Sequence, residues 1–154
     1  MIGNHDDRPA RLAESVGMSR ELVRSYDEIW NTPGWRWSFE TTIDDIHFFH
    51  GTGCSGDHPA YSAARKQAIS VVIGHVHSAG GVKWLVNTRT RMFAMDVGSG
   101  IDDTQYAFVY GRQCIRRSVL SAGVILDNIP YHEIMPAGPG EKYNRNRFKK
   151  SRLV

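Results

Sequence analysis

The spacing of hydrophobic residues changes near Gly34 in this 154-residue chain, from helical before it to strand-like after it. Apolar residues recur every three or four positions over 8–16 and again over 20–30, which predicts two helices. Ser19 is a favourable N-cap for the second of them. Glycine and proline at 33–34 then end the helical pattern. We therefore expect the first part of the chain to be helical.

Short apolar runs separated by turn residues dominate the rest of the chain. Alternation of Trp35, Trp37 and Phe39 with polar residues predicts a half-buried strand. An apolar strand over 46–50, a helix over 59–69 and a β-branched strand over 70–73 predict one strand–helix–strand unit. Further strands are predicted over 83–87, 92–97 and 106–110, with a final hairpin of 123–126 and 131–135 across 127–130. This order indicates a layered α/β or α+β protein.

Charge is distributed unevenly along the chain. From Lys142 to the end there are six basic residues and no acidic ones, although the whole chain carries a net charge of only +3. We therefore divide the chain into a domain over 1–141 and a basic C-terminal tail over 142–154. Such a tail either contacts phosphates of a nucleotide, nucleic acid or other polyanion, or is a solvated, poorly ordered terminus.

Other sequence features bear on the compartment. Two cysteines, Cys54 and Cys114, do not suggest a disulfide framework, and we expect a reducing, cytoplasmic location. No apolar run is long enough for a membrane helix, and the first residues do not resemble a signal peptide. We therefore expect no membrane partner.

Potential metal ligands occur where apolar strands are predicted to end. His75 and His77 follow the strand over 70–73, and His50 closes the strand over 46–50. Asn4 and His5 lie in a third polar segment near the start of the chain. Imidazole nitrogen and amide oxygen are good ligands for divalent manganese, zinc, iron or nickel. Open α/β proteins build their sites at the carboxyl ends of strands, so we expect these segments to meet there.

The ordered set of motifs Gly3-Asn4-His5-Asp6, then His50-Gly51, then Gly74-His75-Val76-His77 resembles that of the calcineurin-like metallophosphoesterases. The resemblance extends from residue 3 to about residue 135. It implies a four-layer αββα sandwich and metal-dependent hydrolysis of a phosphomonoester or phosphodiester, with two divalent metals in the family. On this resemblance the chain is a phosphoesterase (a hydrolase).

The resemblance also implies a role for each motif residue. The implied metal ligands are Asn4, His50, His75 and His77. His5 would be the catalytic imidazole that donates a proton to the leaving oxygen or stabilises charge in the transition state. Asp6 would hold His5 through a hydrogen bond.

Two further motifs of the family do not occur in this sequence. They are an N-terminal Asp-x-His and a Gly-Asp-x-x-Asp, which supply the carboxylates between the two metals. We therefore expect an incomplete sandwich that lacks its first central strands, and a site that holds one metal or is completed by a partner chain or a second copy. The alternative is a catalytically degenerate relative that acts as an assembly or binding protein with at most one metal.

Three other histidines do not belong to these motifs. His47 and His132 are interpreted as surface or structural residues. His58, together with Asp57, follows a glycine-rich loop, and this loop is a hypothetical substrate contact.

Overall fold

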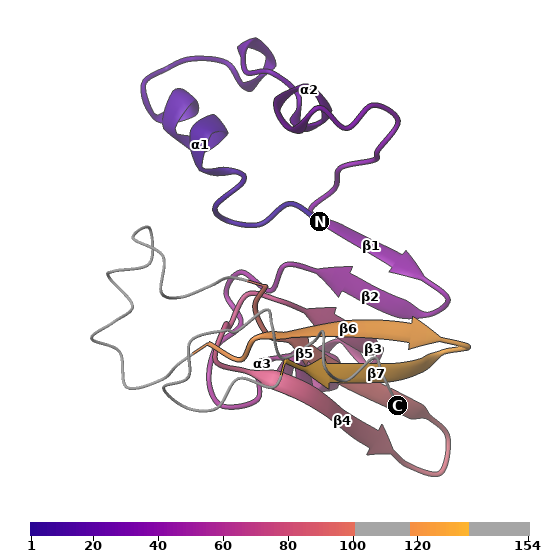
Figure 1. Cartoon of the computed structure of the whole chain (residues 1–154). Coiled ribbons are helices and arrows are strands. Elements are labelled where there is room, and N and C mark those ends of the chain that lie inside the picture. Colours follow the sequence, from indigo (N-terminus) through magenta and orange to yellow (C-terminus); the bar gives the residue numbers. More distant parts are fainter. Residues whose placement is uncertain (101–117, 136–154) are drawn as a thin grey trace, which may run out of the picture.

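The computed structural model describes residues 1–100 and 118–135 (Figure 1). Its elements in chain order are α1 (Arg8–Ser15), the 3-10 helix η1 (Arg20–Leu22), α2 (Tyr26–Trp30), β1 (Glu40–Ile43), β2 (Ile46–Phe49), α3 (Pro59–Gln67), β3 (Ser70–Ile73), β4 (Gly80–Val86), β5 (Arg91–Val97), β6 (Ser121–Leu126) and β7 (Ile129–Ile134). The mixed content confirms the expected α/β class in its broad form. No helix among these residues is long and apolar enough to cross a membrane.

A five-stranded mixed sheet forms the centre of the structure. Its strand order is β1-β2-β3-β5-β4, in which β2, β3 and β5 are parallel and the edge strands β1 and β4 are antiparallel to their neighbours. The predicted strand–helix–strand unit is confirmed as β2–α3–β3. Parallel pairing requires a crossover of this kind, which α3 provides. The carboxyl ends of the three parallel strands therefore lie along one edge of the sheet.

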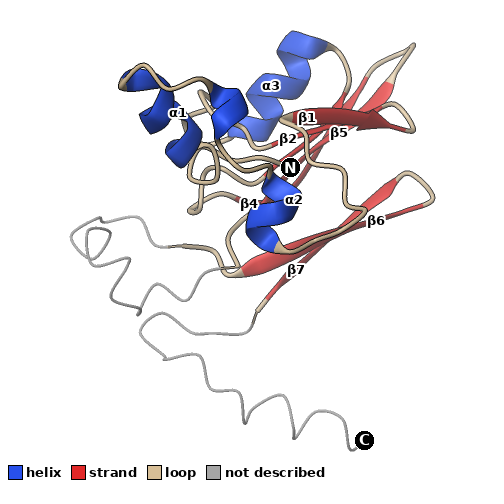
Figure 2. Cartoon of the chain, turned by 90° about the horizontal axis from the view of Figure 1, so that it is seen from above, coloured by secondary structure: helices blue, strands red, loops and turns tan. Residues whose placement is uncertain are grey.

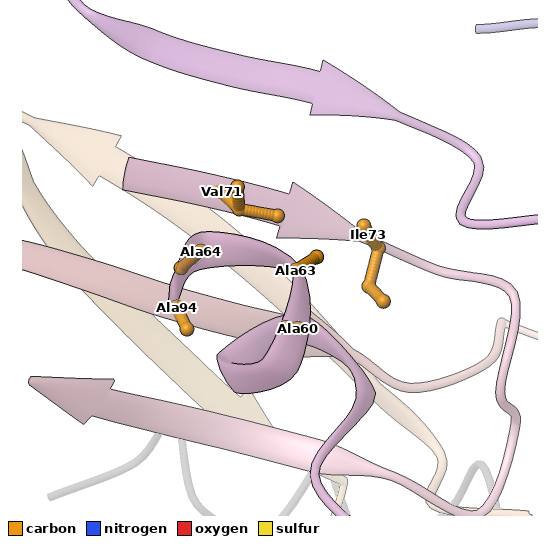
Figure 3. Packing of buried hydrophobic residues seen from close by; sticks show 6 residues of the cluster. All are labelled: Ala60, Ala63, Ala64, Val71, Ile73 and Ala94. Carbon is orange, nitrogen blue, oxygen red and sulfur yellow. The ribbon is translucent and has the colours of Figure 1, made fainter. Parts of the chain in front are cut away.

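Helix α3 and the β6–β7 hairpin cover opposite faces of this sheet (Figure 2). Small residues on α3 let it approach β3 and β5 closely, where Val71, Ile73 and Ala94 are buried (Figure 3). On the other face, Ile125 of the hairpin packs against a cluster that includes Met95. The β-branched run of β3 is buried at every position because both of its faces are covered.

The helix predicted over 20–30 is wrong as a single element. The chain instead forms η1 and α2, with Val23 and Ser25 in extended conformation between them. Ser25 and Glu28 form a capping box, in which the Glu28 carboxylate accepts from the Ser25 backbone N–H at 3.0 Å. This local cap starts a new helix where the apolar stripe alone predicted a continuous one.

The strand predicted over 35–39 is also wrong. The first strand begins at Glu40, and Trp35 is 70% exposed. Trp37 stacks on Tyr26 with ring centroids 5.7 Å apart, and its indole N–H donates to the Thr32 hydroxyl at 3.0 Å. Trp37 therefore makes individual contacts outside any sheet, while Trp35 is largely exposed.

The final hairpin is confirmed, with a tighter turn than the sequence predicted. Strands β6 and β7 pair through Leu126 and Ile129, so only Asp127 and Asn128 connect them. Both of these residues have positive φ (49° and 60°), as a two-residue turn of type I′ requires. The predicted strand over 106–110, Cys114 and the basic tail over 142–154 lie outside the described residues.

Candidate functional site

Two of the predicted ligands come from neighbouring strand ends. His50 follows β2 and His75 follows β3, and these strands pair in parallel. The Gly74 backbone N–H donates to the His50 carbonyl at 3.2 Å, which ties the two strand ends together. The parallel register therefore carries both imidazoles to the same edge of the sheet, as predicted.

The third ligand segment reaches this edge from the start of the chain. Ile2 is buried, and its N–H donates to the Ser38 carbonyl at 2.8 Å just before β1. A turn over residues 4–7 follows. The Asp6 carboxylate accepts from the Gly3 N–H at 2.9 Å and closes this turn. Asn4 thereby faces the strand ends.

Three side-chain atoms that could bind a metal ion converge at this edge of the sheet. His50 Nε2 lies 2.8 Å from Asn4 Oδ1 and 3.0 Å from His75 Nδ1. The two imidazole rings meet edge to face, with centroids 4.9 Å apart. A ring nitrogen of a neutral imidazole either donates one proton or accepts one. His50 Nε2 therefore cannot form full hydrogen bonds with both neighbours.

Two glycines permit this close packing. A Cβ added to Gly3 would lie 2.9 Å from the His50 ring. Gly51 has φ of +97°, and a Cβ there would lie 3.0 Å from Ile73 Cβ and 3.2 Å from His75 Cβ. Any other residue would displace an imidazole or strain the backbone. Gly3 is thus explained by the approach of a histidine, and Gly51 by its positive φ and the approach of Ile73 and His75.

The electrostatics of the site favour the neutral forms of His50 and His77. Burial lowers the pKa of His50, and the adjacent His75 lowers it further. Burial also lowers the pKa of His77, with further contributions from His5 and His75. Neutral rings keep a lone pair available for a metal ion or a hydrogen-bond donor.

The remaining predicted residues lie beside the converging atoms. His77 and His5 are close enough for their charges to affect the pKa of His50, and His5 is exposed to solvent. The Asp6 carboxylate is bonded to the Gly3 N–H, and among the described residues no hydrogen bond joins it to His5. The predicted orienting role of Asp6 therefore stays a prediction.

The donor set can be tested against the geometry of a metal site. Ligands lie about 2.0–2.1 Å from a tetrahedral zinc ion, so neighbouring ligand atoms are about 3.3 Å apart. The observed separations of 2.8 and 3.0 Å are a few tenths of an ångström shorter. The three side chains would have to move apart by this amount to admit one ion. The third possible ligand, Asn4, is an amide and not a histidine, cysteine or carboxylate. Within residues 1–100 and 118–135, no group of three or more histidine, cysteine or carboxylate side chains could hold a metal ion.

The sequence analysis missed Asp7, which organises the segment beside the site. Its buried carboxylate accepts from the Tyr26 hydroxyl at 2.8 Å and pairs with Arg20 and Arg11. Burial, followed by the bond to Asp7, raises the pKa of Tyr26 to about 12. The Asp7–Arg11 spacing of four residues was a detectable signal on a helix. The bonds to Arg20 and Tyr26 depend on tertiary structure.

The other histidines are separate from this group of atoms. His47 on β2 interacts with Gln67, the last residue of α3, and with Glu40, the first residue of β1. His58 precedes α3, and its side chain does not cap this helix. Its contact with substrate stays a prediction. His132 Nε2 is buried without a hydrogen-bond partner among the described residues. The structural interpretation of His47 is consistent with these contacts.

Comparison of this chain with protein-family models, with curated proteins and with solved structures found no match.

Proposed function

We propose that this chain is a metal-dependent phosphoesterase of the calcineurin-like type, built on an incomplete four-layer sandwich. The observation that carries the proposal is the convergence of Asn4 Oδ1, His50 Nε2 and His75 Nδ1 from three separate segments. These are the residues that the motif resemblance assigns to one metal. Their position at the carboxyl edge of a mixed α/β sheet is consistent with a ligand site.

In this proposal the residues of the site have different roles. Asn4, His50 and His75 hold a divalent ion, which supplies polarisation of a phosphoryl oxygen when bound. His77 lies beside them as a neutral imidazole that contacts the same phosphoryl group or a second ion. His5 is solvent-exposed and near these rings, so it is accessible to a leaving oxygen and donates a proton to it.

All four proposed ligands are neutral, which limits the number of ions. Two divalent cations about 3.5–4 Å apart repel strongly unless carboxylates lie between them. We propose one resident ion per chain, with the second, where it binds, held by acidic groups from a partner chain or a second copy. Imidazole ligands favour zinc or nickel over magnesium, which prefers oxygen-rich sites.

The second candidate is a catalytically inert binding protein in which one ion pins the N-terminal segment to the sheet. The lack of the family's Asp-x-His and Gly-Asp-x-x-Asp motifs in this sequence favours this candidate. Like the phosphoesterase proposal, this candidate predicts that one metal ion binds, but it predicts that no phosphoester is hydrolysed.

Metal binding is tested first by dialysis against equal zinc and magnesium, followed by elemental analysis. We expect about one zinc per chain and little magnesium. At a free zinc concentration of one hundred times Kd, the folded state gains about 2.7 kcal/mol, seen as a higher Tm. His50→Ala should abolish both effects, whereas His47→Ala on β2, the strand that His50 follows, should keep them. Equal zinc retention by both variants would remove His50 from the site.

Turnover is tested with a generic aryl phosphodiester and the zinc-loaded chain. We expect His5→Ala to lower kcat by about 10²–10⁴-fold while zinc content is unchanged. Unchanged turnover would remove His5 from the mechanism. Zinc binding with no turnover by the wild-type chain, alone or as an oligomer, would favour the binding protein.

A further inference from the structure

A small cavity lies beside the proposed site, between α1 and the η1–α2 segment. Its volume is about 150 Å³. It is lined in part by Asp6, whose carboxylate accepts from the Gly3 N–H, and Gly3 in turn packs closely against the His50 ring. A cavity of about 150 Å³ admits a single six-membered aromatic ring. The site and the cavity are therefore adjacent, and the cavity has the size of one ring.

The walls of the cavity are mostly apolar. Pro9, Ala10, Val23 and Ile29 contribute aliphatic surface from both helical segments. The ring of Tyr26 adds an aromatic surface, and its stacking on the Trp37 indole holds it in place. Such walls match an apolar group in a ligand, because ligand sites combine apolar surface with a few placed polar groups.

The polar lining of the cavity contains two guanidinium groups, those of Arg20 and Arg24, and the carboxylate of Asp6, which is already bonded to the Gly3 N–H. Tyr26 donates its hydroxyl to the buried Asp7 carboxylate, and its raised pKa of about 12 keeps it neutral at physiological pH. The guanidinium of Arg20 is balanced by Asp7 and by Glu14, whose carboxylate lies 3.1 Å away. Arg24 forms no ion pair within the part of the chain that the structure describes. Among the described lining residues, Arg24 is therefore the cation that an anionic group of a ligand can pair with.

We propose that this cavity binds the organic group of the substrate, and that the substrate is a phosphoester of a single aromatic ring or of an apolar group of similar size. The ring occupies the aliphatic pocket around Ala10, and Arg24 contacts the negative charge of the phosphoryl group. The inference rests on the proposed phosphoesterase function, since that function places the reacting phosphate beside Asp6.

The test measures binding directly, using phosphonates that cannot be hydrolysed. Phenylphosphonate is titrated into the zinc-loaded chain, and binding is followed by calorimetry and by the fluorescence of Trp37, which stacks on Tyr26. Methylphosphonate, which lacks the ring, is the matched ligand. We expect phenylphosphonate to bind at least about tenfold more tightly, a difference of about 1.4 kcal/mol. Equal affinity of the two ligands would overturn the proposal.

Variants locate the binding in the cavity. Ala10→Leu fills the pocket, so we expect it to weaken phenylphosphonate about tenfold and leave methylphosphonate unchanged. Ala13→Leu, on the same helix and outside the cavity lining, is the control and should bind both ligands as wild type does. If Ala10→Leu does not fold, the surface variant Arg24→Gln decides, with an expected loss of about tenfold for phenylphosphonate. Unchanged binding by Arg24→Gln and by a folded Ala10→Leu would refute the assignment.

Turnover separates this inference from the proposed function. If aryl and alkyl phosphoesters are hydrolysed with equal kcat/KM and Ala10→Leu affects neither, the phosphoesterase stands and the ring pocket is wrong. If phenylphosphonate binds with the expected dependence on Ala10 and no phosphoester is hydrolysed, the pocket stands and the enzymatic function is wrong.

Discussion

The unit β2–α3–β3 and the N-terminal segment over residues 8–37 have similar numbers of apolar residues and very different packing. In the first, Val71 and Ile73 are almost completely buried under α3. In the second, α1 buries only Ala10, and Leu12 stays 66% exposed. An apolar stripe is stable where the chain itself supplies the opposing surface. The N-terminal segment is held instead by the polar network around Asp7.

The proposed site draws on both regions. His50 and His75 come from the well-packed unit, while Asn4 belongs to the turn that leads into the weakly packed segment. A metal ion at this point would link the two regions. This difference in packing leads to three predictions, given from the largest expected effect to the smallest.

Truncation of a core residue should separate the two regions most clearly. Ile73→Ala should lower the free energy of unfolding by about 3 kcal/mol, because it leaves a cavity beneath α3. Leu12→Ala should change it by no more than about 0.5 kcal/mol, since that side chain is largely exposed. Urea denaturation followed by circular dichroism measures both. A loss above 2 kcal/mol for Leu12→Ala would mean that the α1 face is packed against another surface in solution.

A glycine substitution tests the close approach at the edge of the sheet. Gly51→Ala should cost about 2–3 kcal/mol, because it combines strain at positive φ with a clash against Ile73 and His75. Gly53→Ala is the matched control, with φ of +88° and no atom within 4 Å of the added Cβ, and should cost about 1 kcal/mol. Urea denaturation gives the costs, and the zinc-induced rise in Tm should weaken only in Gly51→Ala. Identical behaviour of the two variants would contradict the packing argument.

The smallest predicted effect is a pH dependence arising from Asp96 on β5. Burial raises its pKa to about 6 from an ordinary 3.8, although its carboxylate accepts from the Ala60 N–H at 3.3 Å and lies near His58 and Lys83. The folded state therefore binds the proton more tightly than the unfolded state. The stabilisation is present below about pH 4 and is lost as pH rises through about 6.

Asp96→Asn removes this titration. Allowing for partial exposure of the group, we expect the stability of wild type to fall by about 1 kcal/mol relative to Asp96→Asn between pH 4 and pH 7. Parallel urea titrations at several pH values measure the difference. A difference that is constant with pH would show that Asp96 keeps an ordinary pKa in the folded chain.

Prediction from sequence succeeded where local pattern and tertiary contact agree. The strand ending at Ile73 and the helix beginning at Pro59 were predicted closely, because continuous β-branched and small-residue patterns match the surfaces that bury them. Prediction failed over 20–30 and 35–39, where the apolar residues have no common surface to cover. There, capping by Ser25 and the stacking of Trp37 on Tyr26 decided the backbone.

The amino-acid sequence by itself determined which donor groups the chain carries and that His50 and His75 follow strands, because strand ends are encoded by local pattern. It also determined the glycines that let these imidazoles approach. That Asn4 meets them was implied by the motif resemblance and depends on the tertiary structure. Only the tertiary structure decided that Asp7 joins three segments and that a ring-sized cavity lies beside the site. These contacts join residues far apart in sequence, and their geometry depends on parallel register and burial that no short segment specifies.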